Sequence, residues 1–267
     1  MYAFIHMPKT GGSTLRHVLR CSFGAGHCDI KVPPSRRKGQ EWIGPEDLVL
    51  ARKFYPRLAG ICGHRVTCFM GLEEVAPDLR YFTWMREPIR RFMSNYQHDL
   101  RDSGVPDTPD ALRAFAADPR RRNIMTRMLC GGEDGAAAIR QLKTMRVFVG
   151  LTQWFDESFV MFAQWLARPE LKTGYSTRNQ APGLRRSVEQ ESHGLMEVVE
   201  DANREDLVVY RYVVDHLYPE QRRTYVGDLA GEVTALRQRN EEGDLMREPV
   251  LARVKRGFFY KPGLHVA

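Results

Sequence analysis

The start of the chain constrains its fold more than any other stretch. Aromatic and branched residues from Tyr2 to Ile5 predict a short buried strand. Pro8 ends that strand, and Gly11 and Gly12 permit backbone angles that other residues resist. An apolar pattern with helical spacing follows at once, so the sequence predicts a strand, a tight turn and a helix within its first 23 residues.

The turn has the composition of an anion site. Ser13 or Thr14 is expected to cap the helix, and the amides at a helix start favour a negatively charged ligand. Lys9 adds a charge and the glycines leave room for a phosphate or sulfate. A plain strand-to-helix turn would have the same pattern. The predicted anion-binding residues are Lys9, Thr10, Gly11, Gly12, Ser13 and Thr14.

A second strand-to-helix element begins at residue 80. Tyr81 to Met85 predict a buried strand, and Pro88 suits the first turn of the helix that follows. Arg86 lies where the strand ends, and Ser94 lies about two helical turns beyond Pro88. An arginine fork can donate paired hydrogen bonds to phosphate oxygens. We therefore expect a second phosphate contact at Arg86.

Together the two elements resemble the nucleotide motifs of sulfotransferases that use 3′-phosphoadenosine 5′-phosphosulfate (PAPS). Pro-Lys-Thr-Gly-Gly-Ser-Thr is similar to the loop that holds the 5′-phosphosulfate in that family. Arg-Glu-Pro-x-x-Arg-x-x-Ser-x-Tyr is similar to its 3′-phosphate motif, which implies that Arg86 and Ser94 hold the 3′-phosphate. The resemblance also implies a P-loop-like sulfotransferase fold. The Walker order of an ordinary ATPase is absent, because Lys9 precedes the glycines.

A histidine between the two motifs is the candidate general base. Leu58 to Cys62 predict a further core strand, and Gly63-His64 follows it. Taken alone, such a histidine is more often structural than catalytic. In uronyl 2-O-sulfotransferases, which the element resembles, a His-Gly-His segment supplies the base. Here the first histidine is replaced by Cys62, which leaves open whether this cysteine substitutes for a second imidazole.

The remaining chain extends the α/β pattern. Alternating strands and helices predict a central, mostly parallel sheet flanked by helices, with a helical C-terminal third. We expect one domain over 1–267, an acceptor-facing loop at 24–47 and a C-terminal arm at 250–267 that docks or forms a dimer contact. Arg120-Arg121-Arg122 is expected to face solvent or an anionic ligand. A loop that closes over the nucleotide in the family maps to Thr177 and Arg178.

Charge and composition limit the partners. The formal charge of +7 favours an anionic partner, and the basic runs lack the interleaved aromatics of a single-strand nucleic-acid binder. No run approaches the roughly 20 apolar residues of a membrane span, and no leader precedes the first strand. A full-length chain of this kind would be cytoplasmic. The five cysteines form no Cys-x-x-Cys pair, and we expect reduced thiols and no metal.

These observations favour transfer of a sulfuryl group from PAPS to a hydroxyl of a carbohydrate acceptor, anionic or neutral, with PAP (adenosine 3′,5′-bisphosphate) as the other product. Lys9 and His64 are the predicted catalytic residues, in an in-line displacement. Lipid and tyrosine acceptors stay open, as does a homo-oligomer. A P-loop phosphotransferase and a non-catalytic polyanion-binding protein are the alternatives.

Overall fold

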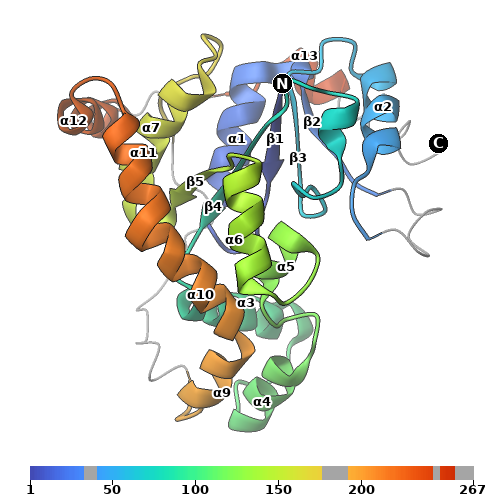
Figure 1. Ribbon diagram of the computed structural model, residues 1–267, viewed down its shortest axis with the longest axis vertical. Helices are drawn as coiled ribbons and strands as arrows, with labels where there is room; N and C mark the ends of the chain where they lie inside the picture. Colours follow the sequence, from blue (N-terminus) through green and yellow to red (C-terminus); the bar gives the residue numbers. More distant parts are fainter. Residues whose placement is uncertain (33–40, 176–191, 243–246, 256–267) are drawn as a thin grey trace.

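Five parallel strands form the centre of the computed structural model (Figure 1). The structure describes residues 1–32, 41–175, 192–242 and 247–255. The strands lie in the order β2-β3-β1-β4-β5. Their bounds are β1 (Tyr2–Ile5), β2 (His27–Asp29), β3 (Gly60–Gly63), β4 (Arg80–Met85) and β5 (Phe148–Leu151). The predicted α/β class with a central parallel sheet is confirmed.

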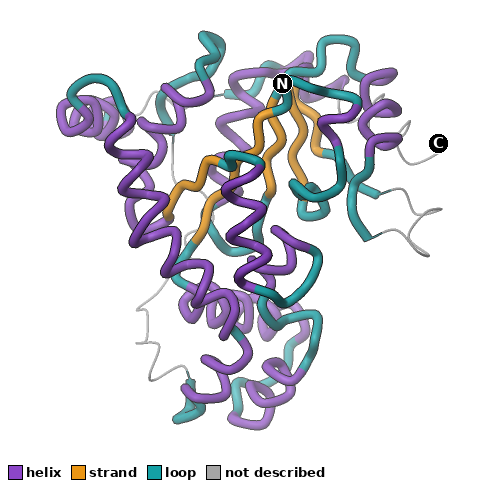
Figure 2. Tube along the Cα trace, in the orientation of Figure 1, coloured by secondary structure: helices purple, strands orange, loops and turns teal. Residues whose placement is uncertain are grey.

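Helices make up most of the remaining described chain (Figure 2). Short 3-10 turns η1 (Gly24–Gly26), η3 (Leu72–Glu74) and η4 (Thr152–Trp154), and a π-helical turn η5 (Val213–Leu217), join them. Beyond β5, the described residues form helices and turns without a further strand. The helices are α1 (Gly12–Phe23), α2 (Pro45–Phe54), α3 (Pro88–Ser103), α4 (Pro109–Ala117), α5 (Ile124–Cys130), α6 (Gly135–Thr144), α7 (Phe155–Leu166), α9 (Met196–Ala202), α10 (Arg204–Tyr212), α11 (Tyr218–Thr224), α12 (Leu229–Glu241) and α13 (Val250–Lys255).

Aromatic side chains hold two helices against one face of the sheet. Tyr2 of β1 packs on Phe23 at the end of α1, with ring centroids 5.1 Å apart. Phe82 of β4 packs on Phe162 of α7 at 4.5 Å. Because Phe4 stacks on Phe82 at 4.8 Å, β1 and β4 present one continuous apolar surface to these helices. In Figure 1, α6 crosses in front of the sheet and α1 lies behind it.

A second, smaller apolar cluster joins α3, α4 and α9. Phe92 and Tyr96 of α3 are buried against Phe115 of α4, with ring centroids 5.1 and 5.4 Å apart. Val199 of α9 completes the cluster. These helices lie below the sheet in Figure 1, beyond the carboxyl end of β4. The 3′-phosphate motif therefore connects the main core to this cluster.

Two expectations about local structure are wrong. Residues 24–47 are not one long loop: η1 and β2 occupy 24–29, and α2 begins at Pro45. β2 is a three-residue edge strand, too short for a periodic signal. Neither Ser13 nor Thr14 caps α1, because the helix already begins at Gly12 after Gly11, which has φ 84° and no side chain to cap with. Residues 33–40 and 256–267 of the predicted loop and arm lie outside the described residues.

Candidate functional site

The three predicted motifs end side by side at one edge of the sheet. Ile5 of β1 pairs with Gly63 of β3 on one side and with Thr83 of β4 on the other. The loop with Lys9, the segment with His64 and the segment with Arg86 follow these strand ends directly. In the strand order, β2 and β3 lie on one side of β1, and β4 and β5 lie on the other. The direction in which strands are added therefore reverses beside β1. Ligands of open α/β sheets bind at such a switch point, outside the carboxyl ends of the strands.

The loop after β1 has a defined, tied-down conformation. Lys9 and Gly11 both adopt positive φ, at 66° and 84°. The buried Thr10 hydroxyl donates to the Met7 carbonyl at 3.0 Å. The Thr152 hydroxyl, just past β5, lies 2.7 Å from the Thr10 carbonyl and 2.9 Å from the Met85 carbonyl, and shares its one proton between them. Thr152 thus ties the loop to the residue that precedes Arg86.

Lys9 lies near two arginines and one aspartate. Partial burial lowers the pKa of Lys9, the charges of Arg101 and Arg86 lower it further, and Asp102 acts in the opposite direction. Across the described residues, no carboxylate forms an ion pair with Lys9 or Arg101. The first amides of α1 add to this charge, because a helix leaves them without intrahelical acceptors. Lys9 and these amides offer positive charge and free donors of the kind that an anionic ligand requires.

The first amides of α3 are capped by a side chain of the protein itself. The Glu87 carboxylate accepts from the amides of Ile89 at 3.0 Å and Arg90 at 2.7 Å. These amides are therefore not available to a phosphate. Arg86 lies half-buried before this cap, and Ser94 lies half-buried on α3.

Arg91, the internal arginine of that motif, is buried rather than part of the surface. It is 0% exposed, and its Nη2 donates to Asn203 Oδ1 at 3.3 Å. The neighbouring Asp206 accepts from the Thr126 amide at 2.7 Å and from the Thr126 hydroxyl at 2.8 Å. Arg91 thus belongs to a buried polar network between α3, α5 and α10.

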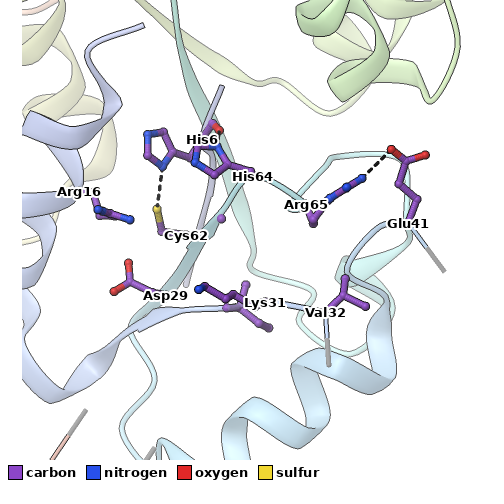
Figure 3. A pocket seen from close by; sticks show the side chains of 11 residues that line it. His6, Arg16, Asp29, Lys31, Val32, Glu41, Cys62, His64 and Arg65 are labelled. Carbon is purple, nitrogen blue, oxygen red and sulfur yellow. Dashed lines mark hydrogen bonds and ion pairs between the residues drawn. The ribbon is translucent and has the colours of Figure 1, made fainter. Parts of the chain in front are cut away.

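His64 lines a cavity of about 650 Å³ beside the loop (Figure 3). Its Nδ1 lies 2.6 Å from the His6 carbonyl, and its ring stacks on the His6 ring, with centroids 4.3 Å apart and planes 28° apart. Solvent reaches the ring through the cavity, yet the surrounding protein lowers the pKa of His64 by desolvation. His64 is therefore a neutral imidazole at neutral pH.

Sequence reasoning missed His6, whose signal was its position directly after the first predicted strand. His6 is 5% exposed, and burial lowers its pKa to about 3. His6 follows β1 directly and brings a second imidazole next to His64. In the family that the sequence resembles, the second imidazole comes instead from the strand that leads to the base. Cys62 lies beside this pair: its Sγ is 3.9 Å from His6 Nδ1, and burial raises the pKa of its thiol well above the ordinary value.

The cavity wall carries more positive than negative charge. Arg16 of α1 and Lys31 after β2 line it, as does Arg65, which pairs with Glu41 at 2.6 Å. Asp29 contributes a carboxylate and forms an ion pair with Arg20. Residues 29–32 and 41 of the expected acceptor-facing segment thus line the same cavity as His64 (Figure 3).

Three ligand-type side chains lie within 4.8 Å of one another at the foot of this cavity: His27, Asp29 and Cys62. Their hydrogen bonds are already used. His27 Nδ1 lies 2.8 Å from the Tyr2 hydroxyl and its Nε2 3.4 Å from Asp29, which also pairs with Arg20. A metal would have to displace these partners, so the cluster is better explained as a buried hydrogen-bond chain.

The basic run 120–122 forms ion pairs within the protein, and Arg120, 85% exposed, faces solvent as one of the two expectations had it. Arg120 pairs with Asp118 at 2.9 Å, Arg121 with Asp99 at 2.6 Å and Arg122 with Asp201 at 2.8 Å. The sequence could not reveal this pairing, because two of the three carboxylates lie on other elements.

Thr177 and Arg178 lie outside the described residues. Within the described part of the chain, none of the helices combines the length and apolar character that crossing a bilayer requires. Neither a family model nor a curated protein sequence matches the chain.

Proposed function

We propose that this protein is a P-loop-like sulfotransferase that transfers a sulfuryl group from PAPS to a hydroxyl of a carbohydrate. The proposal depends on the fact that β3, β1 and β4 are neighbours in the sheet. The candidate base, the proposed phosphosulfate loop and the proposed second phosphate contact follow these three strands in that order. In this proposal the α1 amides and the residues from Thr10 to Thr14 hold the 5′-phosphate, and Arg86 and Ser94 hold the 3′-phosphate. Thr177 and Arg178 remain candidates for closing over the nucleotide.

The transfer is a single in-line displacement. The acceptor oxygen forms a bond to sulfur while the bond from sulfur to the bridging oxygen of the 5′-phosphate breaks. That electron pair stays on the departing PAP, where Lys9 neutralises the growing charge. The acceptor proton moves to Nε2 of His64. The scheme balances without a metal.

The acceptor would occupy the cavity beside His64. Arg16 and Lys31 line it and take part in no ion pair among the described residues, which favours the anionic of the two carbohydrate classes.

A transfer assay tests this proposal. Radiolabelled PAPS is incubated with uronate-containing, neutral and sulfated oligosaccharides, and label in the sugar is measured. His64→Ala should lose about 100- to 10,000-fold in rate with PAP affinity preserved, whereas His17→Ala, a half-buried histidine outside the cavity, should keep its rate. Full activity of His64→Ala would refute the base assignment and direct attention to His98. Magnesium-dependent use of ATP would instead favour the phosphotransferase.

A further inference from the structure

The His6 ring contacts both His64 and the loop after β1. It stacks on the His64 ring at 4.3 Å and on the Phe4 ring at 5.1 Å. It packs so closely under Gly12 that a Cβ there would lie 2.2 Å from His6 Cδ2 and 2.3 Å from Nε2. Gly12 does not have the positive φ of Gly11, so its glycine is needed for space rather than for backbone conformation. One ring thus sets the separation of two parts of the site.

The backbone carbonyl of His6 determines which ring nitrogen of His64 carries the proton. This carbonyl can only accept, so the 2.6 Å contact requires a proton on His64 Nδ1. The lone pair of the neutral ring is then on Nε2. That carbonyl is held because the His6 amide itself donates to the Gly63 carbonyl at 3.2 Å, which extends the β1–β3 ladder. The strand register therefore selects the tautomer that a general base needs.

His6 itself cannot act as the base. Burial, then the neighbouring His64 and Arg16, hold its pKa near 3, and Arg20 acts in the same direction while Asp29 opposes it. A second positive imidazole against a protonated His64 would oppose proton uptake there. A neutral His6 avoids that cost and keeps the stacked face apolar.

We propose that His6 is a positioning residue that holds His64 in its Nδ1–H tautomer and at a fixed separation from the phosphate loop at Gly12. The inference rests on the proposed function only in calling His64 the base. The geometry that it describes can be measured without turnover.

Nitrogen NMR of ¹⁵N-histidine-labelled protein tests the tautomer. In the wild type, His64 should show a protonated Nδ1 and an unprotonated Nε2 at neutral pH. His6→Ala keeps the backbone carbonyl and should keep this tautomer, whereas the His64 pKa should rise toward the ordinary value of about 6.5 because the ring stacked on it is gone. His17→Ala is the matched control and should leave the His64 signals unchanged. If His6→Ala does not fold, His6→Asn serves, because it also removes the ring but leaves less empty space.

A double-substitution cycle tests the spacing. Gly12→Ala alone should lower the melting temperature by roughly 3–8 °C, because its methyl group collides with the His6 ring. In the His6→Ala background the same change should be neutral or stabilising, since the methyl group enters the vacated space. Equal losses in both backgrounds, an unprotonated Nδ1 of His64 in the wild type, or an unchanged His64 pKa in His6→Ala would overturn the inference.

PAP titration of the same samples separates this inference from the proposed function. A fixed tautomer in a wild-type protein that does not bind PAP refutes the nucleotide site and leaves the role of His6 intact. Tight PAP binding with a His64 pKa that is the same in the wild type and in His6→Ala refutes the positioning role alone.

Discussion

Two basic clusters of this protein have opposite surroundings. Arg120, Arg121 and Arg122 each form an ion pair with a carboxylate. At the carboxyl edge of the sheet, by contrast, partial burial lowers the pKa of Lys9, and the like charges of Arg101 and Arg86 lower it further. The first cluster neutralises its charge within the fold, whereas Lys9 and Arg101 form no ion pair among the described residues, so a bound anion would be stabilised beside them.

The comparison separates charge that supports the fold from charge that serves a ligand. Arg122 pairs with Asp201 of α9, and Arg121 with Asp99 of α3, so the first cluster connects three segments of the chain. The second lies where three strand ends converge on a loop with positive φ. A run of arginines in sequence therefore says less about binding than one lysine in the right turn.

Lys9→Ala should have the largest effect. Sulfuryl transfer should fall by about 100- to 1,000-fold, because the charge that develops on the leaving oxygen loses its partner. The PAP dissociation constant should change by only a few-fold. Single-turnover rates and calorimetry measure the two quantities, and Arg121→Ala is the control from the paired cluster. A near-normal rate for Lys9→Ala would remove its catalytic role.

Arg86→Ala should act on affinity rather than on chemistry. Loss of charge-assisted hydrogen bonds to a phosphate should weaken PAP by about 10- to 100-fold. AMP, which has no 3′-phosphate, should bind both proteins about equally. Ser94→Ala should weaken PAP in the same direction but less. An unchanged PAP affinity in Arg86→Ala would contradict the 3′-phosphate assignment.

Acidification should lower the stability of the folded protein because His6 is buried as a neutral imidazole. Its pKa is near 3 in the folded protein and about 6.5 when unfolded, so the unfolded state binds the extra proton and stability falls as the pH drops below about 6.5. Between pH 7.5 and 5.0 this linkage costs about 2 kcal/mol. Urea unfolding at both pH values should show a loss smaller by about that amount in His6→Leu. An identical loss would show that His6 is not buried and neutral.

Arg121→Ala should give the smallest effect. An ion pair that is partly exposed contributes under about 1 kcal/mol, and its removal should leave PAP binding unaltered. Calorimetry and urea unfolding check both statements. A marked loss of PAP affinity would end the distinction between the two clusters.

The sequence predicted the parts of this protein that have strong local signals. Tyr2–Ile5 and the strand before Arg86 are apolar on both faces, and the helix beginning at Pro88 has its proline in the first turn. β2 escaped prediction, since its stability comes from pairing with β3 rather than from its own three residues.

At the candidate site, local motifs located Lys9, His64 and Arg86 but not their partners. His6 meets His64 across 58 positions of sequence, and Thr152 reaches Thr10 across 142. Such contacts follow from the strand order, which single motifs do not encode. The need for glycine at position 12 likewise depends on the His6 ring packed under it.

Calorimetric titration with PAP, beside ADP and AMP and without magnesium, tests the central claim most directly. The account predicts tight binding of PAP, much weaker binding of the two nucleotides that lack a 3′-phosphate, and loss of that preference in Arg86→Ala. Equal binding of all three, or binding of none, would contradict a PAPS site at the ends of β1 and β4 and would favour a general polyanion-binding protein.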